Sequence, residues 1–359
     1  MGTLGLLLLI PIIWPFVAKV LWKHEITLLE MAANLAIGVL FATLAFFGSR
    51  YLQAQDVEVH NGRLLSKASK IVSCEHSYPC NCRQVCSGSG NSRSCTQVCD
   101  TCYEHSHDVD WLLDTQVGTI EVPRVDRQGL KEPARFTKAK PGDAVSLAKA
   151  YQNYIKAAPH SLFNKATEMS LLAQFEGRLP NYPSQVRDLH YVDRVVLHGV
   201  PLKNRAQWNT ALQEMLADLG PRHEVNAVLV FTKEADPQYA EALRAHWLGG
   251  KKNDVVAVIG TAENAIQWVR VFSWTDKELF KVQLRDDLAQ LPELAVEPLI
   301  AVLRDHIKQG FVRKSMQDFE YLKNEIEPPL WLTILLGLMA AAVSVGVSIS
   351  FARNASYSR

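Results

Sequence analysis

The sequence predicts an α+β protein that combines three transmembrane helices, a small cysteine-rich β module and an α/β/α domain. Three observations lead to this fold class. Long uncharged apolar stretches lie near both ends of the 359-residue chain, all seven cysteines fall between Cys74 and Cys102, and strand-like and helix-like patterns alternate in the second half. The predicted segments are a transmembrane helical hairpin (1–50), the cysteine-rich β module (51–130), a linker with short helices (131–190), the α/β domain (191–315), and a juxtamembrane segment with the third transmembrane helix and a tail (316–359).

The apolar stretches are residues 2–18, 31–49 and 330–352. Each approaches the roughly 20 residues that a helix needs to cross the hydrocarbon core of a bilayer. The sequence therefore predicts a multi-pass membrane protein with the lipid bilayer as its first partner. A cleaved signal peptide is the alternative for the first stretch, but this stretch lacks a basic N-terminal region and a cleavage site of small residues.

Basic residues near the helix ends predict the orientation in the membrane. Lys19 and Lys23 lie between the first two helices, and Arg353 and Arg359 follow the third. Positively charged short loops remain in the cytoplasm, so we expect residues 50–328 on the external side of the membrane. A cytosolic location of this segment is the alternative.

The overall charge and the absent motifs exclude several classes of function. The formal net charge is +1, which gives no basic field over the surface, so the sequence predicts no nucleic-acid partner. The Gly-x-Ser-x-Gly motif of serine hydrolases, the His-Glu-x-x-His motif of zinc proteases and the Cys-x-x-Cys-His motif of c-type haem are all missing.

The cysteine-rich segment contains too few large apolar residues to form a core, so cross-links or a metal must hold it. In an oxidising external space, up to three disulfides would form and leave one cysteine over. Alternatively, four thiolates bind zinc, with His76, His105 and His107 as substitutes or supporting groups. A third alternative is a redox pair in Cys99-Asp100-Thr101-Cys102. The disulfide candidates are Cys74, Cys80, Cys82, Cys86, Cys95, Cys99 and Cys102, and the zinc candidates are Cys80, Cys82, Cys99 and Cys102.

The regions that flank the cysteines are predicted to form short strands and helices. Asn61-Gly62 between apolar residues predicts a β-hairpin. Residues 108–113 and 118–126 predict two strands joined by a turn. After a loop rich in Pro, Gly and Lys, the spacing of apolar residues predicts helices over 144–155 and 162–175.

The segment from residue 191 is predicted to contain four strands and four helices. The strands are 191–200, 225–231, 254–259 and 266–274. The helices are 204–219, 237–247, 276–288 and 296–311, and Gly220-Pro221 is expected to end the first of them.

Three groups of polar residues outside the cysteines are candidate binding sites. The run Glu104-His105-Ser106-His107-Asp108-x-Asp110 offers imidazoles and carboxylates to a divalent ion, although Asp108 and Asp110 share a strand face and can both face water. Gly249-Gly250-Lys251-Lys252 offers amides and charges to an anion, but it follows a helix, which favours a structural turn with Gly249 as the helix C-cap. Asp236, Asp254 and Asp276 lie at the ends of predicted elements, where a carboxylate can hold a metal or, for the first and last, cap a helix.

The α/β domain resembles the TPM domain family over residues 200–315. The resemblance rests on the helix from Pro237 to Leu243, the sequence Trp247-x-Gly249-x-Lys251-Lys252-Asn253, the strand from Asp254 to Gly260, a later helix pair and a C-terminal membrane helix. The usual Asp-x-x-Gly-x-Leu entry is replaced by Gly199-Val200-Pro201-Leu202, and the usual Gly-Val-Leu strand start by Asp254-Val255-Val256. The resemblance implies a small extracytoplasmic domain with a membrane anchor, in a family that includes photosystem II repair proteins and in which some members are credited with phosphatase activity.

The cysteine-rich region is similar to a module of uncharacterised membrane proteins encoded by tailed bacteriophages. The similarity is carried by Ser73-Cys74-Glu75-His76, Tyr103-Glu104-His105, Asp108-Val109-Asp110-Trp111 and Arg124-Val125-Asp126-Arg127-Gln128-Gly129. It implies a phage product in the inner membrane of a bacterial host, with residues 50–328 in the periplasm.

Two functions follow from these predictions. The first is a non-enzymatic membrane-anchored protein that displays the cysteine-rich module and the TPM-like domain for interaction with envelope or virion proteins. The second is a membrane-tethered, phosphatase-like hydrolase that acts through the TPM-like domain. The expected cofactor is either none or Zn.

Overall fold

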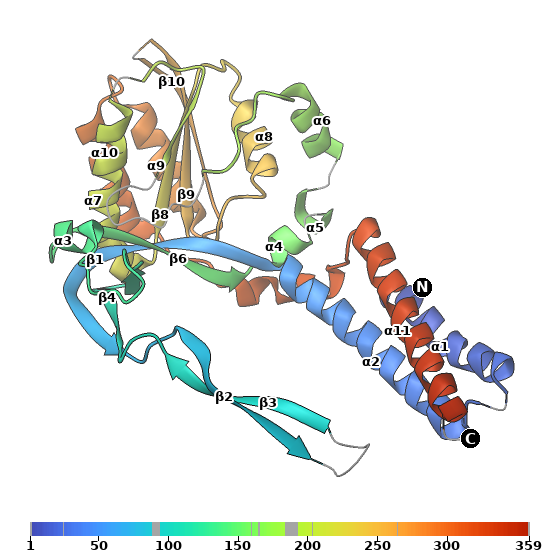
Figure 1. Ribbon diagram of the computed structural model, residues 1–359. Coiled ribbons are helices and arrows are strands. Elements are labelled where there is room, and N and C mark those ends of the chain that lie inside the picture. The colour runs from blue at the N-terminus through green and yellow to red at the C-terminus, as the bar shows by residue number, and fades with distance from the viewer. Residues whose placement is uncertain are drawn as a thin grey trace.

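The computed structural model describes residues 2–23, 25–87, 94–158, 160–163, 166–183, 193–202, 204–263 and 265–357. They form a bundle of three long helices, a four-stranded sheet from which a hairpin projects, and an α/β domain (Figure 1). The predicted α+β mixture is confirmed.

The helical bundle consists of α1 (Thr3–Leu21), α2 (Leu28–Gln53) and α11 (Leu330–Tyr357). All three helices are long and apolar enough to cross a membrane, as predicted, and each packs against the other two. The turn between α1 and α2 and the C-terminus both lie at the end of the bundle that is far from the α/β domain (Figure 1).

A small polar cluster lies between the three helices. Asn34 Nδ2 of α2 donates to Ser348 Oγ (2.6 Å) and to Ser344 O (3.0 Å) of α11, and Trp14 Nε1 of α1 donates to Ser348 Oγ (3.1 Å). In lipid, apolar helices gain little hydrophobic energy by associating, so close packing and such hydrogen bonds hold them together. The cluster therefore fixes which faces of the helices meet.

The first sheet is built around β1 (Gln55–Val72), a long strand that follows α2 almost directly. The sheet order is β5-β4-β1-β6, and every pair of neighbours is antiparallel. The other strands are β4 (Asp108–Thr115), β5 (Gly118–Val122) and β6 (Ala144–Gln152). The strand pair predicted after the cysteines is thus confirmed as β4 and β5.

The hairpin predicted at Asn61-Gly62 is wrong, because both residues lie inside β1. The type I′ turn that Asn-Gly favours needs positive φ at both positions, and neither residue has one. The Asn61 side chain instead makes contacts outside β1. Its Nδ2 donates to Val225 O of the α/β domain (3.0 Å), and its Oδ1 accepts from Ser146 Oγ of β6 (2.8 Å).

The helix predicted over 144–155 is also wrong, because most of this segment forms β6 and only α4 (Tyr154–Ala157) is helical. β6 pairs with β1 from Gln55 to Arg63. The hydrogen bonds that this edge of β1 offers outweigh a helical pattern made largely of small residues. The region predicted as a linker therefore contributes a strand to the first sheet, together with the short helices α3 (Ala134–Lys138), α5 (His160–Phe163) and α6 (Ala166–Gln174).

The α/β domain contains a second sheet of order β10-β9-β8-β7, in which the first three strands along the chain are parallel and β10 is antiparallel. Helices cover both faces of this sheet (Figure 1). The elements are β7 (Val195–His198), α7 (Arg205–His223), β8 (Asn226–Thr232), α8 (Gln238–His246), β9 (Asp254–Ala262), β10 (Ala265–Ser273), α9 (Glu278–Ala289), α10 (Val296–Gly310) and the 3-10 helix η2 (Met316–Glu325), which leads back to α11.

The four strands and four helices predicted for this domain are present. Residues 191 and 192 of the first predicted strand lie outside the described residues. α7 continues through Pro221, where the sequence predicted its end. A proline in the last turn removes only one backbone hydrogen bond, so it need not stop the helix where it stands.

The two crossover connections of the α/β domain have opposite hands. β7, β8 and β9 follow one another across the sheet in one direction, yet α7 packs on one face and α8 on the other. Crossovers between parallel strands are right-handed in nearly all proteins, so one of these two belongs to the rare left-handed class. This distinguishes the domain from ordinary doubly wound α/β folds.

The α/β domain packs directly on the first sheet. Gly220 of α7 lies so close to β1 that a Cβ atom there would be 2.1 Å from Asn61 O. Arg194, which is only 1% exposed, donates to Asn61, Ser146 and Asn226 and so joins the two sheets. Burial lowers the pKa of this guanidinium to about 10.

Candidate functional site

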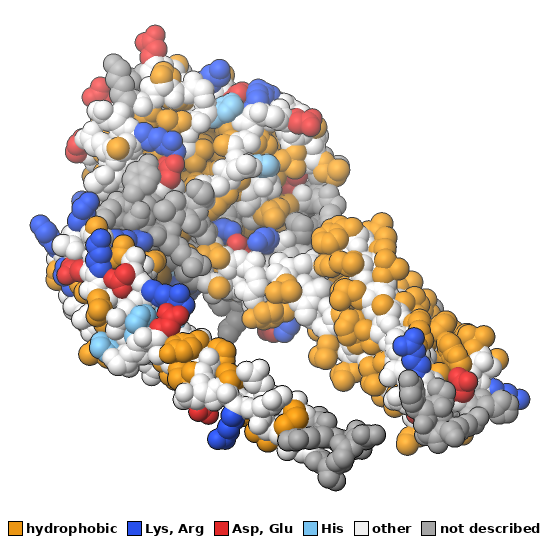
Figure 2. Space-filling view, viewed as in Figure 1, with side chains coloured by type: hydrophobic (Ala, Val, Ile, Leu, Met, Phe, Trp, Pro, Cys, Tyr) orange, Lys and Arg blue, Asp and Glu red, His pale blue; other side chains and the backbone are white. Residues whose placement is uncertain are grey.

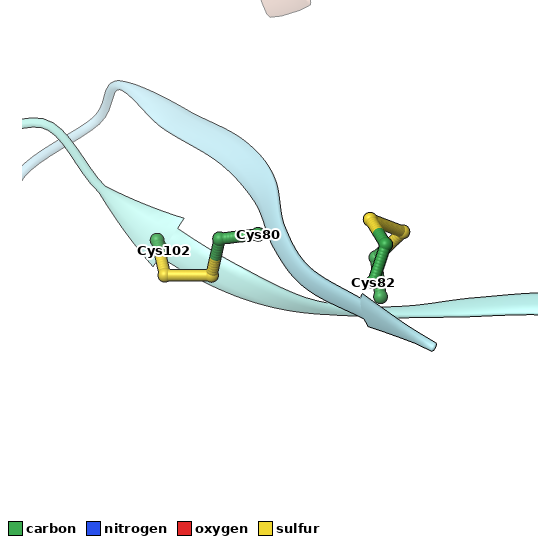
Figure 3. Close-up of a disulfide and its surroundings, with 4 residues drawn as sticks. Cys80, Cys82 and Cys102 are labelled. Atoms are coloured by element: carbon green, nitrogen blue, oxygen red, sulfur yellow. A yellow bond between two sulfur atoms is a disulfide. The ribbon is translucent and has the colours of Figure 1, made fainter. Parts of the chain in front are cut away.

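Six cysteines form a ladder of disulfides along a two-stranded hairpin made of β2 (Ser77–Ser87) and β3 (Ser94–Tyr103). The pairs are Cys80–Cys102, Cys82–Cys99 and Cys86–Cys95. Figure 3 shows the first of them joining the two strands, with Cys82 farther along the hairpin. A lone pair of strands is at best marginally stable in water, so the cross-links replace the missing core.

This pairing separates the alternatives for the six cysteines. All four zinc candidates, Cys80, Cys82, Cys99 and Cys102, are bonded to another sulfur and offer no thiolate to a metal. Cys99 and Cys102 belong to different disulfides, so they do not form the redox pair that their spacing suggests. The structure favours the disulfide interpretation.

The hairpin projects from the first sheet and is largely exposed (Figures 1 and 2). Among the described residues, β2 pairs only with β3, so the outer edge of each strand is unpaired. Val85 and Val98 are 48% and 45% exposed and share one face, because they lie opposite Thr96 and Arg83 in the strand register. The hairpin therefore offers two open backbone edges and an exposed apolar face.

The seventh cysteine, Cys74, lies at the base of the hairpin with a buried, free thiol. Its Sγ is 3.7 Å from Nδ1 of His105, and the same nitrogen is 3.4 Å from Oδ1 of Asp108. The three atoms lie within 4.8 Å of one another, which is close enough for all three to bind one metal ion. We refer to Cys74, His105 and Asp108 as the base cluster.

Asp108 is the most buried member of the base cluster, with a side chain that has no exposed surface. Its Oδ2 accepts hydrogen bonds from Glu75 N (3.0 Å) and Arg124 Nη1 (3.0 Å). Its Oδ1 lies 3.4 Å from His105 Nδ1 and has no well-formed hydrogen bond within the described residues. The Glu75 amide, followed by the Arg124 charge, holds the pKa of Asp108 below its usual range despite the opposing effect of burial. The carboxylate is therefore ionised at neutral pH.

The rest of the run from residue 104 to residue 110 does not join the base cluster. Glu104 pairs with Arg127, His107 Nδ1 lies 2.9 Å from Ser106 Oγ, and Asp110 pairs with Arg124. The expectation that Asp108 faces water is wrong, because the fold buries it behind Arg124. Sequence reasoning placed Cys74 only among the disulfide candidates, although the odd number of cysteines was a signal that one of them differs.

Two of the aspartates predicted as candidates in the α/β domain, Asp236 and Asp254, do not come together. Asp236 follows the carboxyl end of β8 and Asp254 begins the parallel strand β9, so they lie at opposite edges of the sheet. Asp254 is fully buried and accepts hydrogen bonds from Tyr182 Oη (2.7 Å) and Asn226 Nδ2 (2.9 Å). Burial raises its pKa. These contacts give Asp254 a structural role, out of reach of a substrate.

The segment Gly249-Gly250-Lys251-Lys252 binds a carboxylate of the chain itself. α8 ends in a Schellman motif whose hydrogen bonds run from Gly249 N to Arg244 O (2.8 Å) and from Leu248 N to Ala245 O (3.1 Å). Lys251 N then donates to Asp254 Oδ2 (2.7 Å). The predicted structural turn is confirmed, but the C-cap of α8 is Trp247 and not Gly249, and Leu248, Gly249 and Gly250 all have left-handed φ values.

A pocket of about 590 Å³ opens beside Asp276 at the edge strand β10. Its cationic lining residues are Arg244, Arg270, Lys281, Arg285 and Lys314. Four of these pair with carboxylates, and one such pair is Lys314 with Asp276 itself (2.7 Å). Arg270 has no acidic partner in the part of the chain that the structure describes. The pocket thus presents one uncompensated cation to a negatively charged ligand.

Comparison of the chain with family models, with curated proteins and with solved structures finds no match. The resemblances to the TPM domain family and to phage membrane proteins therefore stay predictions. The function has to be inferred from the hairpin, the base cluster and the pocket themselves.

Proposed function

We propose that the protein is a non-enzymatic, membrane-anchored protein that displays the disulfide hairpin for interaction with another protein. The observation that carries this proposal is the hairpin's exposure: a segment cross-linked three times presents its apolar face and both edges to solvent. Such cross-links make the hairpin rigid, because it has no hydrophobic core of its own to hold it. Rigidity lowers the entropy lost on binding and so favours a recognition role.

The proposed location of residues 50–328 is the external side of the cytoplasmic membrane, which is the periplasm if the host is bacterial. Lys19, Lys23 and Arg353 lie at the far end of the bundle, where the positive-inside rule places the cytoplasm. Disulfides persist in oxidising compartments and are rare in the cytosol, which supports the same orientation.

The proposed partner is an envelope or virion protein that presents an extended strand. An exposed sheet edge binds such a strand through main-chain hydrogen bonds, and alternate side chains give specificity. The hairpin and the helical bundle extend away from the α/β domain toward the same side (Figure 1), so the partner would bind on the membrane side of the first sheet. Between residues 77 and 103 only Arg83, Arg93 and Asp100 are charged, which suits that environment.

Site-specific photo-crosslinking in native membranes tests this proposal. A photoreactive residue in place of Val98 is expected to give discrete protein adducts, whereas one in place of Leu279, which is exposed on α9 of the α/β domain, gives none. The adducts should disappear when the hairpin cysteines are replaced by serine. Identical adducts from both positions, or none from Val98, would exclude the hairpin as the contact surface.

A second candidate function is hydrolysis of phosphate esters, which the cationic pocket at Asp276 favours. Arg270 would bind the phosphate, and Asp276 is a carboxylate that lines the same pocket. The full-length protein in detergent, assayed with a generic aryl phosphate, is then expected to lose activity in both Arg270→Ala and Asp276→Asn. A wild-type protein without hydrolysis at any divalent-ion condition rules this function out.

A further inference from the structure

We propose that Cys74, His105 and Asp108 bind one divalent cation of the zinc class at the base of the hairpin. Their side chains supply a thiolate, an imidazole and a carboxylate, which are the three ligand types that zinc uses in proteins. Three protein ligands leave the fourth tetrahedral position for a water molecule. This proposal is independent of any partner of the hairpin.

The two distances that His105 Nδ1 makes with the other donor atoms fit a tetrahedral ion. Zinc–ligand bonds of about 2.3 Å to sulfur and about 2.0–2.2 Å to nitrogen and oxygen put S and N about 3.6 Å apart, and N and O about 3.4 Å apart, at tetrahedral angles. The observed separations are 3.7 Å from Cys74 Sγ to His105 Nδ1 and 3.4 Å from His105 Nδ1 to Asp108 Oδ1. Two of the three separations therefore match zinc ligands, and the third, from Cys74 Sγ to Asp108 Oδ1, is at most 4.8 Å.

Hydrogen bonding within the cluster explains this arrangement less well than a cation does. Both Cys74 and Asp108 approach the same ring nitrogen of His105, which can carry at most one proton. Asp108 Oδ1 is fully buried and has no well-formed hydrogen bond among the described residues, because its contact with His105 Nδ1 is 3.4 Å long. A buried carboxylate oxygen without a hydrogen bond is costly, and a metal ion would compensate it.

The surroundings of Asp108 resemble the outer shell of a metal site. Arg124 and the Glu75 amide both bind Oδ2 and so turn Oδ1 toward Cys74 and His105. Such contacts orient a carboxylate ligand before the metal arrives.

The proposed ion would fix the direction in which the hairpin leaves the sheet. Cys74 precedes β2, His105 follows β3, and Asp108 begins β4, so the ligands come from both ends of the hairpin and from the sheet. Cys74 would bind as a thiolate and release its proton, so the apparent affinity for zinc is expected to fall as the pH falls.

The free thiol gives a direct measurement on the full-length protein in detergent. With six cysteines in disulfides, a small thiol reagent reports on Cys74 alone in the absence of reductant. Zinc is expected to slow this reaction at least about tenfold, and a chelator to restore it. Cobalt in place of zinc should give thiolate-to-metal charge-transfer absorption, and metal analysis should find one zinc per chain.

Matched variants separate a metal site from a merely buried thiol. His105→Gln and Asp108→Asn should lose zinc protection at least about tenfold, and Cys74→Ser should lose the cobalt band, whereas His107→Ala, in the same segment, keeps both. Mass analysis of each variant shows whether the three disulfides are intact. Wild-type protein whose thiol reactivity does not respond to zinc overturns the proposal, and so does a Cys74→Ser variant that still binds zinc with wild-type affinity.

Discussion

The disulfide ladder makes a quantitative prediction about the local stability of the hairpin. The three cross-links join cysteines 22, 17 and 9 positions apart. By lowering the entropy of the unfolded chain, each disulfide alone would stabilise the hairpin by about 3.4, 3.1 and 2.6 kcal/mol at 25 °C, in that order. These values do not add, because the three loops are nested. The outermost disulfide therefore sets a lower limit of about 3 kcal/mol for the three together. A two-stranded hairpin with exposed valines has little else to oppose opening.

Replacing all six disulfide cysteines by serine is therefore expected to raise the rate of tryptic cleavage after Arg83 about a hundredfold. The control replaces only Cys86 and Cys95, since the two outer cross-links then still hold the hairpin closed. Cleavage at Arg83 at the wild-type rate in the six-serine variant would show that contacts outside the hairpin stabilise it. A parallel loss of thermal stability in the α/β domain would refute the view that the cross-links act locally.

Three further predictions concern the body and the bundle. Gly220→Ala should lower the free energy of unfolding by about 3 kcal/mol, because its Cβ would clash with a β1 carbonyl. The control is Gly48→Ala, whose Cβ would have nothing within 4 Å and which should change this free energy little. Thermal unfolding measures both variants. Burial would raise the pKa of Asp56, but the Lys251 charge and hydrogen bonds hold it lowered. Its ionised form thus stabilises the fold at neutral pH, and this contribution is lost as the pH falls below about 4, so Asp56→Asn should flatten the acid limb of a pH–stability curve. Asn34→Leu should weaken the bundle by about 1 kcal/mol in a detergent denaturation series.

Much of the fold follows from local sequence patterns. In a bilayer, a long uncharged run can satisfy its backbone hydrogen bonds only as a helix. The bounds of α1, α2 and α11 follow those runs. The strands β8 and β9 can likewise be predicted from the sequence, because a run such as Asn226–Thr232 is apolar almost throughout, and the structure buries it at every position. In both cases the residues of one element carry the whole signal.

The errors occur where a distant segment decides the local structure. Asn61-Gly62 has the composition of a turn, but Ser146 and Val225 form hydrogen bonds with the Asn61 side chain, and both residues remain in the strand. Residues 144–152 have a helical pattern, but the free edge of β1 offers them a complete set of hydrogen bonds. A pattern read along the chain contains no information about such an edge.

The cysteine-rich segment shows the same division between sequence and tertiary structure. Its composition by itself determined that cross-links or a metal must hold it, because it has too few large apolar residues to form a core. Only the tertiary structure decided which cysteines pair, since Cys86 faces Cys95 solely through the strand register, and that Cys74 stays free. The base cluster likewise exists only because the sheet brings Cys74 next to His105 and Asp108, more than 30 positions away along the chain for both.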